Sequence, residues 1–135
     1  MQDKLVIFDL DGTLIDSREL HFDALNDALE KVGPQYVITR DEHLSTFDGL
    51  NTTKKLKMLS EKKGLPTEMH DFVWREKQEA TFNLLKRLKT DHIFINMFQK
   101  IKLRGYKIAV ASNSIRETIK LSLLYIGVME YVDYI

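Results

Sequence analysis

Cysteine is absent from the 135 residues, which excludes a disulfide, a thiolate nucleophile and a cysteine-ligated metal. Basic and acidic residues number 20 each, so the composition gives no excess positive charge for nucleic acid or an anionic membrane surface. No apolar run is long enough for a signal peptide or a membrane span. Repeats and low-complexity tracts are also absent. These absences favour a cytoplasmic protein with no nucleic-acid or membrane partner.

The order of expected elements is strand, helical block, helix, strand, helix, strand. The apolar run at 4–8 predicts a parallel strand covered on both faces, and KIAVA at 107–111 predicts a second strand. Helical spacing predicts helices at 17–32, 51–63, 67–88, after Asp91 and at 115–126, and YVDYI reads as the start of a third strand. This order indicates an α/β fold with an inserted helical segment over the carboxyl edge of the sheet, where such sheets bind ligands.

Asp9 and Asp11 follow the first strand directly, and two carboxylates so close repel each other unless a cation lies between them. Mg²⁺ suits this pair, because it binds one or two carboxylates together with phosphate oxygens and water. An ionised aspartate is also a nucleophile toward phosphorus, and a second one can act as acid and base. Gly12 permits a tight turn, and Thr13 can place a hydroxyl nearby. The alternative is an ordinary strand-to-turn transition, since Asp and Gly are common turn residues.

The stretch FDLDGTLIDS at 8–17 closely resembles the first motif of the haloacid dehalogenase-like hydrolases, and VASNS at 110–114 fits their second motif. The resemblance implies a Rossmann-like parallel-sheet core of about three strands at 1–15 and 90–135, with a helical cap at 16–89. It implies that Asp9 is the nucleophile and Asp11 the general acid and base. It also implies that Mg²⁺ is bound by the Asp9 carboxylate and the Asp11 carbonyl.

The same resemblance implies that two residues of the second motif bind phosphate. Ser112 matches the phosphate-binding serine or threonine of the family, with the Asn113 amide beside it. Judged from the residues alone, Ser112 is equally typical of a helix N-cap. Parallel neighbouring strands would nevertheless bring the residues after Phe8 and after Ala111 together at one edge. We therefore expect Gly12, Thr13, Ser112 and Asn113 to form a phosphate site.

The insertion resembles the small helical cap of the phosphoglycolate phosphatase and β-phosphoglucomutase branch. His21 matches a histidine near the hinge of the mutases, and Thr52 falls where phosphonate-cleaving relatives carry a lysine and the mutase an arginine. A shift of the alignment would place Lys54 or Lys55 there instead. His21 and Thr52 are therefore candidate substrate contacts. The alternative for His21 is a structural role, because most single histidines at a helix edge are structural. The favoured activity is a Mg²⁺-dependent phosphatase of a small phosphorylated metabolite, acting through an aspartyl-phosphate.

The family also uses a lysine and a later acidic pair that this sequence does not supply. We therefore expect a C-terminally truncated chain that is weakly active or inactive, because several preorganised charges are missing together. The alternatives are a non-catalytic remnant or interaction module that keeps the fold, and a phosphosugar mutase. The first strand would form an open sheet edge, which predicts self-association through that edge.

Overall fold

The computed structural model describes residues 3–135 of the chain. These residues form two compact units: one comprises the chain up to Ser17 and from Leu85 onward, and the other comprises Arg18–Leu84. None of the described helices is long and apolar enough to cross a membrane. Each unit has its own architecture and is described separately.

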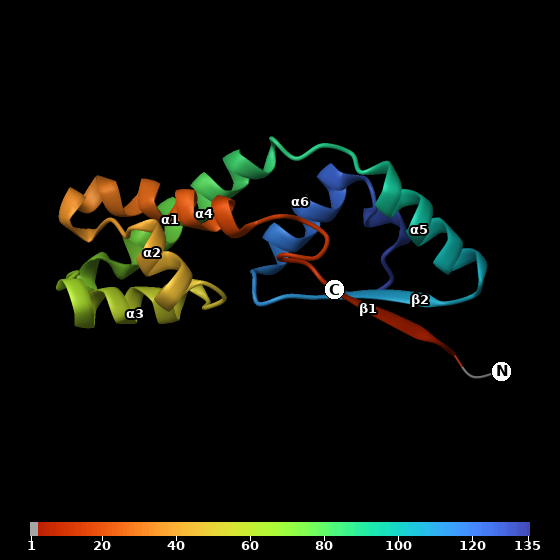
Figure 1. Cartoon of the computed structure of the whole chain (residues 1–135), viewed down its shortest axis with the longest axis horizontal. Coiled ribbons are helices and arrows are strands. Elements are labelled where there is room, and N and C mark those ends of the chain that lie inside the picture. The colour runs from red at the N-terminus through yellow and green to blue at the C-terminus, as the bar shows by residue number, and fades with distance from the viewer. Residues whose placement is uncertain (1–2) are drawn as a thin grey trace. The chain divides into compact units, whose positions relative to one another are not determined.

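The first unit contains a parallel sheet of β1 (Leu5–Asp9) and β2 (Lys107–Ala111), which lie side by side in Figure 1. Their register pairs Leu5 with Lys107 and Asp9 with Ala111, so the carboxyl ends of both strands meet at one edge. Both predicted strands are confirmed. The expected third strand is present only as a single parallel bridge between Ala109 and Tyr134, on the side of β2 away from β1.

Helices α5 (His92–Leu103) and α6 (Arg116–Ile126) lie on one side of this sheet in Figure 1, and a 3₁₀ turn follows at Met129–Tyr131. Ile108 and Val110 are buried beneath the helices, and the Phe8 ring stacks on Phe98 of α5 with centroids 4.7 Å apart. Residues of the opposite parity face away from the helices: Leu5 is 51% exposed and Ile7 62%. The expectation of a strand covered on both faces is therefore wrong for the described residues. Connections that step repeatedly in one direction along a parallel sheet place their helices on the same face.

The second unit contains helices joined by short loops, and no strand lies among its described residues. Its helices are α1 (Arg18–Val32), α2 (Arg40–Glu42), α3 (Thr52–Lys63) and α4 (His70–Leu85), with 3₁₀ turns at Pro34–Tyr36 and Thr67–Met69 and a π-helical turn at His43–Phe47. One apolar core joins these elements, formed by Leu25, Ala28, Leu29, Ile38, Phe47, Leu56, Leu59, Leu65 and Val73. The three long helices were predicted from their apolar spacing, and α2 with its π-helical turn was not.

Side-chain caps fix where several of these helices begin. Asn51 accepts a hydrogen bond from the Lys54 N–H at the start of α3, and Asp91 accepts from Ile93 and Phe94 at the start of α5. Thr39 and Glu42 form a reciprocal capping box around α2. Such caps satisfy backbone donors that have no partner within the helix. The capping box explains why a helical turn forms at α2 without an apolar repeat.

Candidate active site

The segment after β1 folds into a tight turn that presents Asp9 and Asp11 at the carboxyl edge of the sheet. Leu10 is fully buried, and its carbonyl accepts hydrogen bonds from the N–H groups of Thr13, Leu14 and Ile15. The Gly12 N–H donates to the Ile15 carbonyl at 2.8 Å. Gly12 has φ +79°, a left-handed conformation that glycine adopts most readily. The turn is therefore anchored by Leu10 and closed by Gly12.

Asp11 accepts hydrogen bonds from three serine hydroxyl groups. Ser17 Oγ donates to Asp11 Oδ1 at 2.6 Å. Ser112 and Ser114 both donate to the other carboxylate oxygen, Oδ2, at 3.1 and 3.3 Å. The Ser114 N–H in turn donates to Ser112 Oγ at 3.1 Å. Asp11 thus joins the turn after β1, the residue before α1 and the turn after β2 in one network.

Asp9 lies at the last position of β1, and its side chain is exposed to solvent. The Leu10 N–H donates to Asp9 Oδ1 at 2.9 Å, which orients the carboxylate at the strand end. Asp9 pairs in register with Ala111, so the next residue, Ser112, leaves β2 beside it. The structure thereby brings the expected nucleophile, the expected acid and base, and the expected phosphate-binding serine to one edge of the sheet.

The remaining expected site residues are only partly at this edge. Gly12 and Thr13 lie in the turn, but their N–H groups donate to the Ile15 and Leu10 carbonyls within the turn. Asn113 is exposed directly after Ser112. His21 and Thr52 belong to the helical unit, in α1 and at the start of α3, and Thr52 is 8% exposed. Their expected substrate contacts remain predictions.

Ser17 and Ser114 complete the network and were not among the expected site residues. In the sequence, Ser17 is the last residue of the first motif and the first of the helix predicted at 17–32, and Ser114 is the last residue of the second motif. Their hydroxyls reach Asp11 because the turn after β2 and the residue before α1 both border the turn after β1. A second serine so close to Ser112 could have indicated a role for Ser114, but its partner Asp11 lies 103 positions away in the chain, so the sequence alone does not reveal the contact.

The donor set at this edge suits a hard divalent cation. The Asp9 carboxylate is exposed, and it and the Asp11 backbone carbonyl could offer oxygen ligands of the kind that Mg²⁺ prefers. Among the described residues, no group of three or more His, Asp or Glu side chains is arranged to hold a metal. Protein side chains here would provide part of a coordination shell, as is usual for Mg²⁺, which keeps water and substrate oxygens as ligands.

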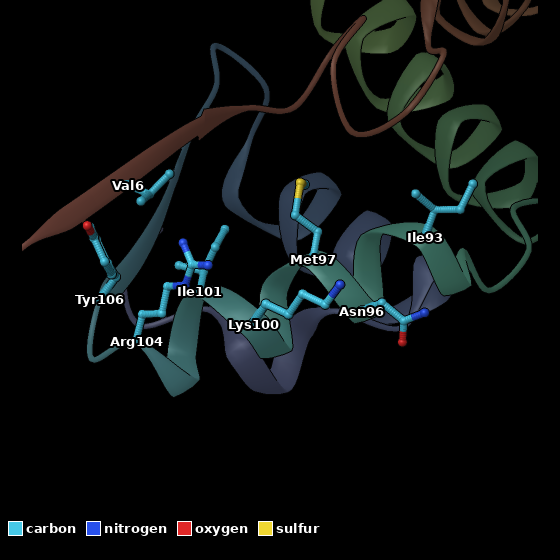
Figure 2. A pocket seen from close by; sticks show the side chains of 8 residues that line it. All are labelled: Val6, Ile93, Asn96, Met97, Lys100, Ile101, Arg104 and Tyr106. Carbon is cyan, nitrogen blue, oxygen red and sulfur yellow. The ribbon is translucent and has the colours of Figure 1, made fainter.

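A pocket of about 690 Å³ lies elsewhere in the same unit, between the start of β1 and α5. In Figure 2, Val6 points from β1 toward α5, whose Met97 and Ile101 form the apolar wall, with Lys100 and Arg104 at the rim. Its volume would admit a small ligand. No carboxylate or hydroxyl nucleophile other than the Tyr106 phenol lines it, so we do not place the reaction there.

His43 is the most unusual polar group of the helical unit. It is 3% exposed, and neither ring nitrogen has a hydrogen-bond partner. Burial, and then the nearby Lys55 ammonium, lower the pKa of His43 from its ordinary value of 6.5. Asp48 opposes this shift, with Oδ1 at 3.9 Å from Nε2. Burial therefore favours the neutral form of the imidazole.

Comparison with known proteins identifies relatives across nearly the whole chain. A family model described as haloacid dehalogenase-like hydrolase matches residues 6–135. The pyrophosphatase PpaX of Bacillus velezensis is 28% identical over 136 residues, which covers 95% of this chain and 56% of that protein. The chain therefore spans little more than half the length of this curated relative.

Solved structures share the fold at lower identity. CbbY from Rhodobacter sphaeroides, solved with xylulose-(1,5)bisphosphate, superposes with a TM-score of 0.83 at 19% identity, over 98% of this chain and 62% of that one. A predicted phosphoglycolate phosphatase of Haemophilus somnus gives 0.79 at 21% identity, over 99% and 62%. The family match and the paired strand ends agree: this chain belongs to the haloacid dehalogenase-like hydrolases.

Proposed function

We propose that this chain belongs to a phosphoric monoester hydrolase that acts on a small phosphorylated metabolite, and that it carries the nucleophile and the acid-base residue of that enzyme. The observation that carries the proposal is the hydrogen bond from Ser112 to Asp11, which joins two motifs 101 residues apart beside Asp9. A nucleophile, a proton carrier and a hydroxyl donor for phosphate then share one sheet edge. CbbY was solved with a bisphosphate and also with phosphate, which supports a phosphorylated substrate.

The proposed reaction has two steps. In the first, an Asp9 carboxylate oxygen bonds to phosphorus while the bond from phosphorus to the leaving oxygen breaks, and Asp11, which takes up a proton when the phosphorylated substrate binds, gives that proton to the leaving oxygen. In the second, water attacks phosphorus, Asp11 takes the water proton, and the bond between Asp9 and phosphorus breaks. The products are the alcohol and inorganic phosphate, and both aspartates return to their starting forms.

Mg²⁺ is the proposed cofactor, held by the Asp9 carboxylate and the Asp11 carbonyl. When bound, it would neutralise negative charge on the phosphoryl oxygens and on Asp9, which otherwise repel each other. Ser112 and the Asn113 amide would orient the phosphoryl group by hydrogen bonds. The two carboxylates then have different tasks because Asp9 is exposed at the strand end, whereas Asp11 is held by serines.

The test is the trapping of the phosphorylated aspartate. The chain is incubated with acetyl phosphate and Mg²⁺, and intact-mass spectrometry measures the gain of one phosphoryl group. We expect phosphorylation of the unaltered chain, none of Asp9→Asn, and persistence of the label in Asp11→Asn, because the acyl leaving group needs no acid but hydrolysis needs a base. Labelling that survives in Asp9→Asn, or no labelling of the unaltered chain even after long incubation, would contradict the proposal, whereas slow labelling agrees with the expected weak activity.

A further inference from the structure

Asp11 and a bound phosphate would compete for the single proton of the Ser112 hydroxyl. A serine hydroxyl has a single proton to donate. Ser112 gives its proton to Asp11 Oδ2, and the orientation is fixed because the Ser114 N–H occupies an acceptor position of Ser112 Oγ. A phosphate bound at Ser112 needs that same proton. Ser112 therefore cannot serve Asp11 and phosphate at the same time.

We infer that phosphate capture switches the Ser112 hydroxyl from Asp11 to the phosphoryl group, while Ser17 and Ser114 act as positioning residues that retain Asp11. This inference rests on the proposed function of Asp9, Asp11 and Ser112. It adds the roles of Ser17 and Ser114 and a direct coupling between substrate binding and the acid-base group.

The geometry supports retention after the switch. Ser17 donates to Oδ1 at 2.6 Å, the shortest of the three contacts, and Ser114 donates to Oδ2 at 3.3 Å. One donor therefore remains on each carboxylate oxygen when Ser112 turns away. Ser17 is buried at 2% exposure and cannot readily exchange Asp11 for water. Asp11 stays in place but loses one hydrogen bond at the moment when phosphate arrives.

The coupling predicts a specific pattern in phosphate affinity. Asp11→Ala releases the Ser112 proton, whereas Asp9→Ala removes the same charge without releasing it. With inorganic phosphate as the probe and calorimetry as the measurement, we expect Asp11→Ala to bind phosphate about tenfold more tightly than Asp9→Ala, because the competing bond is to a charged acceptor. In a Ser112→Ala background this difference should vanish.

Equal affinities of Asp11→Ala and Asp9→Ala, or a difference that survives in the Ser112→Ala background, would overturn the switch. If none of the variants binds phosphate, the proposed phosphate site fails along with it. Labelling of Asp9 by acetyl phosphate is a separate readout. The switch can therefore fail while the proposed function stands.

The positioning role of Ser114 has its own readout. Labelling of Asp9 by acetyl phosphate needs no acid, but hydrolysis of the label needs Asp11 in place as base. Ser114→Ala should leave the labelling rate unchanged and slow the loss of label about tenfold. This factor is smaller than the full contribution of a general base, because Asp11 is still present but less well positioned. Ser114→Thr, which restores a hydroxyl, should recover the rate. A Ser114→Ala chain with unchanged hydrolysis, or with labelling and hydrolysis slowed together, would contradict the role.

Discussion

At the scale of single residues, the turn after β1 depends on a backbone conformation that most side chains resist. Gly12 has φ +79°, and a Cβ added there would meet no atom within 4 Å. The requirement for glycine is therefore conformational and not one of space. Gly49, in the helical unit, has φ +80° and the same open surroundings. The two glycines form a matched pair, one beside the aspartates and one in the other unit.

Gly12→Ala and Gly49→Ala should each lower the free energy of unfolding by about 1 to 2 kcal/mol, because the left-handed conformation is costly for alanine. Urea unfolding of each variant measures this loss. Only Gly12→Ala should also reduce labelling of Asp9 by acetyl phosphate, since only this glycine shapes the turn. Loss of labelling in both variants would show a general effect of instability, and retention in both would remove Gly12 from the site.

The residues of the site differ in how far the sequence could reveal them. Asp9, Asp11 and Ser112 were predicted because they match the two motifs of the family and follow predicted strands, and parallel strands bring their carboxyl ends together. Ser17 and Ser114 were missed because their role depends on the side-chain directions of two turns, which apolar spacing does not encode. Local patterns thus located the strand ends, while the hydrogen bonds between distant turns required the structure.

At the scale of elements, the π-helical turn His43–Phe47 buries a titratable group within the helical unit. The groups that act on the His43 imidazole are Lys55 of α3, Asp48 of the following loop, and Glu19 and Arg18 of α1. The Phe22 ring packs against it, with centroids 5.0 Å apart. Burial is the largest influence and lowers the pKa of His43 below 6.5. The folded state therefore binds the His43 proton less readily than the unfolded state does.

This difference fixes the sign of a pH effect. Well above pH 6.5 both states hold His43 neutral, and His43 causes no loss of stability. As pH falls below 6.5, the unfolded chain gains a proton that the folded chain does not, so stability decreases. Urea unfolding at a series of pH values from neutral to mildly acidic should show this decrease, and His43→Leu should weaken it.

His92→Gln serves as the control, because His92 is exposed at the start of α5 and its replacement also removes one imidazole. We expect His92→Gln to keep the acid-induced loss of stability. His43→Leu should also match or exceed the unaltered chain in stability, since it replaces a buried imidazole that has no hydrogen-bond partner by an apolar side chain. An unchanged pH dependence in His43→Leu would contradict the assignment to His43.

The elements themselves were largely predictable from the spacing of apolar residues. KIAVA forms β2 within the predicted limits, and α3 and α6 begin one residue inside theirs. The cover of β1 was predicted wrongly, because a continuous apolar run indicates two apolar faces without showing what lies against each. The turn at α2 was missed because its capping box, and not apolar spacing, stabilises it. Long helices and strands with regular apolar spacing were therefore predicted correctly, whereas a short helical turn stabilised by a capping box was not.

At the scale of the whole molecule, the sheet has one apolar face and one edge that no element among residues 3–135 pairs with or covers. Leu5 and Ile7 project from the face that α5 and α6 do not cover, at 51% and 62% exposure. Within the described residues β1 pairs only with β2. An exposed apolar strand of this kind favours pairing with another chain. The expected self-association through β1 remains a proposal, with a second copy of this chain as the partner.

Ile7→Lys should reduce this association, because a charged side chain at the centre of β1 opposes both edge pairing and burial of the uncovered face. Sedimentation velocity over a series of chain concentrations measures the effect. Leu124→Lys is the control, since Leu124 is 60% exposed but lies on α6, away from β1. We expect association of the unaltered chain and of Leu124→Lys to rise with concentration, and Ile7→Lys to remain monomeric. Equal behaviour of both variants would show that association, if any, does not pass through β1.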